Sequence, residues 1–376
     1  MRKTLSILLF LFLVQTSLFA QIDMSGRCYY PEFDTTANNN LLFRLENNNF
    51  LKNNEYFGNY AEGYTLIGFS LQPSLMYYAG RRFRIKAGVH LTQFFGESGF
   101  TDVLPVISAH LKATKRFEII MGALSGDVNH NLIEPMFNPE YQYLRPVENG
   151  LQFLFNSYRF TMDTWIDWEQ FITWGDTIPE RFTAGFSSKT NITNKGSNIE
   201  LSVPVQLLAF HQSGQISDYN DLSYSLVNTR LGVTLSGDVG KGFIQKVWLD
   251  ASYLGYKELS GPYGIGFESG HAIYPVAGVN YKYGQLMMGY WYADNYFALK
   301  GNPIFQSVSN YKENFYNRYR NVGTIKFKFT RTYMKELTFN AGFDAYYDFS
   351  ASQFDYSYGV SIIYTPNFKI AEFSSR

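Results

Sequence analysis

Apolar and polar residues alternate along most of the chain, and the alternation is most regular in residues 337–349. One parity holds Leu337, Phe339, Ala341, Phe343, Ala345, Tyr347 and Phe349, and the other holds Thr338, Asn340, Gly342, Asp344 and Asp348. A period of two predicts a β-strand with one apolar and one polar face. The segment is longer than the usual globular strand of about five or six residues, and about 9 to 11 residues suffice for a tilted strand to cross a bilayer.

The same alternation recurs from Leu41 onward, for example in residues 83–92, 199–207 and 356–364. We predict about sixteen strands, with ends uncertain by roughly two to four residues. They are 41–52, 64–79, 82–94, 102–113, 116–124, 150–156, 158–170, 181–191, 197–211, 223–236, 243–256, 269–283, 285–292, 318–332, 337–349 and 355–368. The segment 285–292 alternates poorly, and without it the number falls to about fourteen.

The connections between these strands alternate between short turns, such as 80–81 and 194–196, and longer loops, such as 125–149 and 293–317. Sorting of connections by end is typical of a membrane barrel and gives an even number of strands. The predicted fold is therefore all-β, a transmembrane antiparallel up-and-down β-barrel over residues 41–368. A large soluble sandwich or solenoid is the alternative. Pro73, Pro105, Pro204 and Pro275 fall inside predicted strands, where we expect bulges or bends.

Composition agrees with a barrel. Aromatic residues make up 18% of the chain, with 30 Tyr and 34 Phe, as two interfacial belts of aromatic residues require. The formal net charge is +0, which gives no electrostatic basis for binding nucleic acid. We find no nucleotide, phosphate or metal motif, so the sequence predicts no cofactor and no metal.

The chain resembles the outer-membrane β-barrels of Gram-negative bacteria, specifically the porin-like family, over residues 41–368. The final strand, YSYGVSIIYTPNF, looks like the terminal strand by which such barrels are recognised for assembly, with Phe368 or Phe373 as its aromatic end. The resemblance implies the cell outer membrane as location, membrane lipid and small hydrophilic solutes as partners, and transport as function. It leaves homo-oligomerisation open.

The termini complete the predicted organisation. Residues 1–20 have the basic start, apolar run and small final residue of a cleaved signal peptide. Residues 21–40 are predicted as a periplasmic lead-in, and residues 369–376 as a periplasmic tail. Cys28 is the only cysteine, so it has no internal disulfide partner.

Charged residues of the polar parity are predicted to line the pore: Arg44, Glu46, Arg84, Lys86, Lys112, Asp163, Asp167, Glu169, Arg230, Lys326, Lys328 and Asp344. The first strands carry mostly basic residues, whereas Asp163, Asp167 and Glu169 lie on one strand. A basic wall facing an acidic ladder selects solutes by charge. The alternative is that these groups only hydrate the wall.

The loop 125–149 is longer than most connections, which indicates a functional or inward-folded segment. It is the third long loop and carries His130, Glu134 and Glu140, so we predict a constriction that faces Arg44, Arg84 and Lys86. The alternative is a loop packed on the surface.

The predicted function is an outer-membrane channel for small hydrophilic solutes, without catalytic residues and not an enzyme. His211 and His271 have the lipid-facing parity near the outer ends of their strands, three strand spacings of about 4.8 Å apart, which is too far for a catalytic pair. The alternative function is a barrel that binds a ligand or hydrolyses lipid at its outer rim.

Overall fold

The fold is that of a computed structural model, which describes residues 33–125, 130–214, 216 and 223–373. The predicted signal peptide, Cys28, most of the predicted lead-in and the last residues of the predicted tail lie outside the described residues.

Seventeen strands form one antiparallel sheet. They are β1 (Asn40–Glu55), β2 (Thr65–Ala79), β3 (Phe83–Phe94), β4 (Asp102–Leu111), β5 (Phe117–Ala123), β6 (Asn149–Asn156), β7 (Phe160–Gln170), β8 (Glu180–Asn191), β9 (Ile199–Ser213), β10 (Tyr224–Asp238), β11 (Ile244–Ser260), β12 (Ser269–Tyr281), β13 (Gly284–Asp294), β14 (Tyr319–Met334), β15 (Leu337–Asp348), β16 (Gln353–Tyr364) and β17 (Asn367–Glu372). In the part of the chain that the structure describes, two short helical segments, α2 (Tyr141–Leu144) and the 3-10 turn η1 (Pro303–Phe305), lie in loops. Among the described residues no helix is long and apolar enough to cross a membrane.

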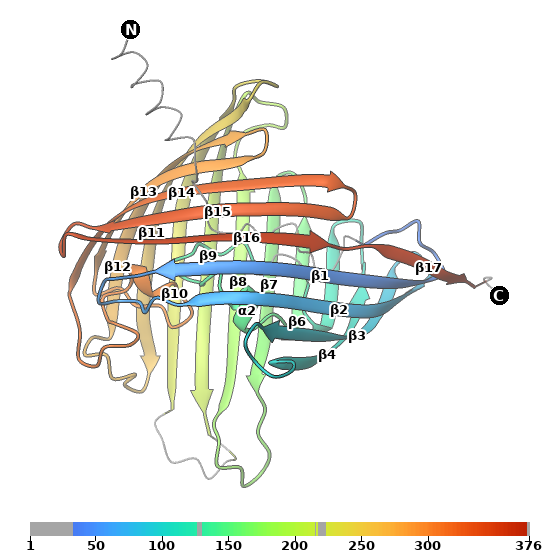
Figure 1. The fold of residues 1–376 in the computed structure, drawn as a ribbon, viewed down its shortest axis with the longest axis horizontal. Coiled ribbons are helices and arrows are strands. Elements are labelled where there is room, and N and C mark those ends of the chain that lie inside the picture. The colour runs from blue at the N-terminus through green and yellow to red at the C-terminus, as the bar shows by residue number, and fades with distance from the viewer. Residues whose placement is uncertain (1–32, 126–129, 215, 217–222, 374–376) are drawn as a thin grey trace.

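The sheet closes on itself through β1. This strand pairs with β2 on one side and with both β16 and β17 on the other (Figure 1). β17 continues β16 after the interruption at 365–366, so the wall holds sixteen strand positions and ends at Glu372, beyond the predicted 368. The predicted antiparallel up-and-down barrel is confirmed, and because β13 forms at 284–294, the strand number is sixteen rather than fourteen.

The distribution of polar and apolar side chains between the two faces of the wall is the reverse of that in a soluble protein. On β11, Leu249 and Tyr253 are 51% and 53% exposed on the outer surface, whereas Asp250 and Ser252 are buried inside. Polar side chains therefore fill the interior and apolar side chains cover the outside, as lipid solvation demands.

The prolines within strands do not cause the bulges expected from the sequence. Pairing of β2 with β3 is interrupted beside Pro73, and that of β9 with β10 beside Pro204, but the register is the same on both sides. The register shifts occur elsewhere, for example at Trp168/Gln170 and Ser225/Leu226. The missing backbone N–H of each of these prolines thus interrupts the pairing locally, and no extra residue is inserted into the strand.

The connections between strands differ in length between the two ends of the barrel. The loop end of the barrel carries 56–64, 95–101, 124–148, 171–179, 214–223, 261–268, 295–318 and 349–352. The turn end carries mostly short connections, such as 80–82 and 282–283. We call the described residues of 124–148, which are 124–125 and 130–148, the third loop, 261–268 the sixth loop and 295–318 the seventh loop.

The third and seventh loops fold into the barrel and hold each other. The backbone N–H of Asn138 donates to the Lys300 carbonyl (2.6 Å), and that of Asn302 donates to the Glu134 carbonyl (3.1 Å). Apolar side chains of both loops, among them Met136, Phe137 and Phe305, join one buried cluster with inward residues of the wall such as Trp291. The interior is therefore largely filled at the level of these loops.

Cysteine labelling tests which end of the barrel faces outward. In a background with Cys28→Ser, we expect Glu313→Cys, on the exposed seventh loop, to react with a membrane-impermeant maleimide in intact cells. Lys195→Cys, on the turn between β8 and β9, should react only after permeabilisation, because short turns face the periplasm in such barrels. The opposite pattern of labelling would reverse the orientation.

Candidate functional site

Two glutamates of the third loop are held by lysines on different parts of the wall. Glu140 Oε1 accepts from Lys52 Nζ of β1 at 2.7 Å and from Asn54 Nδ2 at 2.8 Å, and Glu140 also bonds the Tyr64 hydroxyl. Glu134 pairs with Lys326 of β14. Burial alone raises the pKa of Glu140, but the Lys52 ammonium and these hydrogen bonds lower it below the ordinary value. Both glutamates are thus charged and attach the third loop to the barrel wall.

Among the described residues, the basic residues Arg44, Arg84 and Lys86 contact other residues of the wall and not the third loop, which the sequence predicted them to face. Arg44 Nε donates to Glu46 at 2.8 Å, Lys86 Nζ lies 3.5 Å from the same carboxylate, and Arg84 contacts His110 at 2.9 Å. These basic residues are buried against partners on their own wall. The acidic residues of the third loop meet Lys52 and Lys326 instead of Arg44, Arg84 and Lys86.

His130, in the third loop, lies between two carboxylates. Its Nδ1 lies 2.8 Å from Asp163 of β7, its Nε2 lies 2.6 Å from Glu148, and its ring stacks on Trp165 at 3.6 Å. Burial alone lowers the pKa of His130, but Asp163 and Glu148 raise it to about 10. Gly185 on β8 makes room for the Trp165 ring, because a Cβ there would lie 2.1 Å from it.

The other predicted pore-lining residues also lie inside the barrel, mostly in ion pairs. Asp167 and Glu169 bind Arg145 of the third loop, and Glu169 also binds Lys300 of the seventh. The remaining residues form pairs along the wall (Lys112 with Glu118, Arg230 with Asp250, and Lys326 with Asp344), while Lys328 lines a cavity. The sequence did not single out Lys52, although it shares the parity of Arg44 and Glu46.

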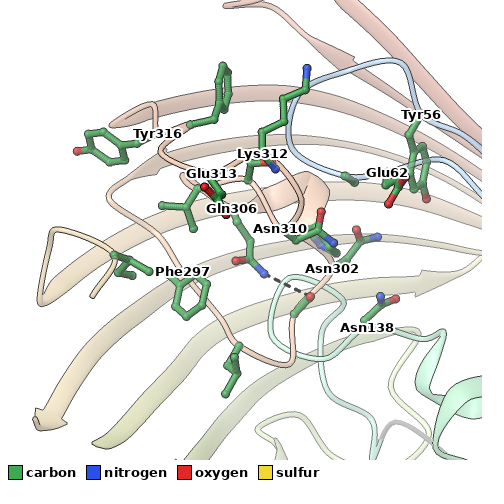
Figure 2. A pocket seen from close by; sticks show the side chains of 18 of the residues that line it. Tyr56, Glu62, Asn138, Phe297, Asn302, Gln306, Asn310, Lys312, Glu313 and Tyr316 are labelled. Atoms are coloured by element: carbon green, nitrogen blue, oxygen red, sulfur yellow. Dashed lines mark hydrogen bonds between the residues drawn. The ribbon is translucent and has the colours of Figure 1, made fainter. Parts of the chain in front are cut away.

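Cavities lie on both sides of the inward-folded loops. One of about 780 Å³ opens at the loop end (Figure 2), and one of about 810 Å³ lies toward the turn end, beside Lys112, Arg116 and Ser187. A smaller cavity of about 280 Å³ lies between Ile133 and Glu134 of the third loop and the wall of β10 to β14. Residues of the third loop line all three of these cavities.

A second cluster lies on the opposite, outward face of the wall near the loop end. His211 Nδ1 of β9 lies 2.8 Å from Ser225 Oγ of β10, and the Ser260 hydroxyl of β11 donates to Ser225 Oγ at 3.0 Å. Five residues lie side by side on the neighbouring strands β7 to β11, each paired with the next: Trp168, Phe182, His211, Ser225 and Ser260. A base within hydrogen-bond reach of a hydroxyl is the arrangement that activates a serine nucleophile.

The sequence placed His211 on the outward face but not next to Ser225. The two residues are separated by a loop, so their contact depends on the register of β9 against β10. Strand parity could have shown that both face outward. The distance between His211 and His271, on which the sequence argument rested, does not bear on a histidine–serine pair.

The other histidines are less suited to this chemistry. His90 contacts the Thr92 hydroxyl at 3.0 Å, but both side chains are buried in the wall. His110 and His130 are bound to carboxylates, and His271 stacks on Tyr253 at 5.9 Å. Within the described ranges, no group of three His, Cys, Asp or Glu side chains is placed to hold a metal ion.

The contacts of His130 with Asp163, Glu148 and Trp165 predict that tryptophan fluorescence changes at a higher pH than an ordinary histidine would give. A protonated imidazole quenches a stacked indole, so wild type should be dimmer than His130→Gln at neutral pH. Because the pKa of His130 is raised, the stabilising contact is complete below about pH 6.5 and is lost as pH rises through about 10. The difference between the two proteins should therefore persist at pH 8, fall to about half near pH 10 and disappear at higher pH. Trp165→Phe provides the background signal, and a transition near pH 6.5 would contradict these contacts.

Searches with solved structures identify the fold. OprD from Pseudomonas aeruginosa aligns with a TM-score of 0.53 and 9% identity over 94% of this chain and 98% of its own. A loop-deletion mutant of the Vibrio cholerae outer-membrane protein OmpT aligns with a TM-score of 0.51 and 12% identity over 87% and 99%. The trimer form of OmpT aligns with a TM-score of 0.50 and 8% identity over 87% and 100%. These similarities support the same type of barrel, located in the outer membrane.

No curated protein matches the sequence. The family model described as "Lipid A 3'-O-deacylase-type" matches residues 33–373, which is nearly all of the barrel. Because a deacylase is an enzyme, this match overturns the sequence-based prediction that the protein is not one. The chain is a porin-like outer-membrane β-barrel that belongs to the lipid A 3'-O-deacylase-type family.

Proposed function

We propose that this protein hydrolyses an acyl ester of a lipid A-type glycolipid, with Ser225 as nucleophile and His211 as general base. The observation that carries the proposal is the 2.8 Å contact between His211 Nδ1 and Ser225 Oγ on the lipid-facing surface. The family match supports the reaction class.

The position of the pair suits an ester at the boundary between head groups and hydrocarbon. Trp168 and Tyr319 are exposed on the same outward face, at the loop ends of β7 and β14. Such aromatic side chains prefer the membrane interface. Trp168 stacks on Phe182 at 5.3 Å and Phe182 lies 5.0 Å from His211, so an acyl chain can lie on an apolar surface beside the histidine.

The chemistry follows from the contacts of Ser225. With the Nε2–H tautomer of His211, Nδ1 accepts the Ser225 proton while Oγ attacks the ester carbonyl. The protonated imidazole then gives this proton to the departing sugar oxygen, which leaves an acyl group on Ser225. Water, deprotonated by His211, attacks the acyl group, releases the fatty acid and restores the Ser225 hydroxyl. The Ser260 hydroxyl, which donates to Ser225 Oγ, positions the nucleophile.

Substitution of the pair tests the proposal. Ser225→Ala and His211→Gln should each lower fatty-acid release from lipopolysaccharide, measured by mass spectrometry, by roughly 10²–10⁴-fold, the usual contribution of acid–base catalysis. Thr229→Ala is the matched control, since Thr229 is an exposed hydroxyl on the same face of β10. Heat-modifiable migration should be unchanged in all variants. Activity retained in Ser225→Ala would exclude this serine as the nucleophile.

A second function is supported by the interior of the barrel. We infer that small hydrophilic solutes pass between the cavities of about 780 and 810 Å³, with the third loop as the constriction. Lys112, Asp163 and Arg230 line the cavity toward the turn end, and this charged lining suits hydrated solutes. His130, Glu134 and Glu140 set the position of the constriction because each ties the third loop to the wall. Self-association, as in the trimer form of OmpT, remains a prediction.

Release of the third loop tests this constriction. Glu134→Gln with Glu140→Gln breaks two buried ion pairs, and removing one partner of such a pair costs about 3–5 kcal/mol. We expect single-channel conductance in planar bilayers to rise, because the loop leaves the lumen. Glu97→Gln, in the exposed loop 95–101 and outside the lining of these cavities, should leave conductance unchanged. Equal conductance of wild type and the double variant would show that the third loop does not limit passage.

A further inference from the structure

The cavity at the loop end has the size of a small-ligand site. Its volume of about 780 Å³ lies within the range of ~300–1,000 Å³ that such sites occupy. Four loops contribute: 56–64, the third, the sixth and the seventh. In Figure 2, Tyr56 and Glu62 lie on one side of the cavity and Phe297 and Tyr316 on the other.

Aromatic rings supply much of the lining. They are Tyr56, Tyr64, Tyr141, Tyr263, Phe297, Phe315 and Tyr316. Tyr263 is half-buried and is supported from behind, because its ring lies 4.9 Å from Tyr224 and 5.2 Å from Phe297. Rings held in this way offer flat apolar surfaces with polar hydroxyl edges.

Amide side chains lie between the rings: Asn138, Asn302, Gln306, Asn310 and Asn314. Several are fixed by bonds to the loops. Gln306 Nε2 donates to the Ala298 carbonyl at 2.7 Å, and Asn138 Oδ1 accepts from the Glu140 N–H at 3.1 Å. Each fixed amide has a second polar atom, Gln306 Oε1 and Asn138 Nδ2, so the cavity combines donors and acceptors in set positions.

The charges of the cavity do not favour an anion. Glu140 is neutralised by Lys52, and Lys312 donates to Asn59 at 2.5 Å. Glu62 and Glu313 are exposed acids at the rim. A phosphate site needs clustered cations or backbone N–H groups, whereas this lining holds one lysine beside several carboxylates.

We propose that the loop-end cavity binds a neutral oligosaccharide. The apolar face of a pyranose ring packs on aromatic side chains, and its neighbouring hydroxyls pair with amides and carboxylates, which are the groups that line this cavity. The site is separate from the outward His211–Ser225 pair, so it does not depend on acyl hydrolysis.

Binding to a glycan array of neutral and acidic oligosaccharides tests the proposal. The full-length protein is purified in a zwitterionic detergent, since a maltoside would compete for the site. We expect retention on neutral glycans, and at least a tenfold weaker signal for Tyr263→Ala because the supported ring is lost. Tyr263→Phe should bind like wild type, since the ring remains.

A variant on the lipid-facing surface provides the control. Tyr253→Ala removes an exposed tyrosine far from the cavity lining and should leave glycan binding unchanged. Retention of acidic glycans alone, absence of binding to any glycan, or equal binding by Tyr263→Ala would each overturn the proposal. Heat-modifiable migration of each variant verifies that the barrel is folded.

Discussion

Closure of the barrel through β1 is the constraint on which the rest of the structure depends. In lipid, an unpaired backbone group costs several kcal/mol, so each edge strand must find a partner. β1 meets this demand by pairing with β2 along one edge and with β16 and β17 along the other. Once the sheet is closed, alternate side chains must face lipid or the interior. This explains why Leu249 is exposed while its neighbour Asp250 is buried.

An interior lined by charges needs partners for them, and the inward-folded loops supply many. Lys52 and Lys326 would be costly if left buried alone, because an unpaired buried ion loses its hydration. Glu140 and Glu134 of the third loop neutralise them, and Lys300 of the seventh loop does the same for Glu169. The ion pairs therefore position the loops more than they strengthen the wall.

The sequence predicted the wall well because period two is a local property. Even the weakly alternating segment 285–292 forms a strand, since it lies between β12 and β14 and completes their pairing. The contacts across the barrel interior could not be predicted from the alternation of residues. Lys52 and Glu140 are 88 residues apart, and no periodicity relates a loop residue to its partner on the wall. The His211–Ser225 pair required the register between two strands, whereas parity alone gave only the face. Inward burial of His130 between Asp163 and Glu148 likewise depends on the path of the third loop.

The two proposed functions, hydrolysis of an acyl ester and passage of solutes, rest on opposite faces of the same strands, so they do not compete for residues. On β9, His211 points outward while Gln206 points inward and bonds the third loop through the Asn131 carbonyl at 2.6 Å. On β10, Ser225 faces lipid, whereas Arg230 faces the interior and binds Asp250. Because side chains alternate strictly along a strand, a change at one face leaves the other largely intact. The two proposals are therefore compatible in one barrel: in them the acyl substrate reaches Ser225 from the membrane, and hydrophilic solutes enter the interior from water.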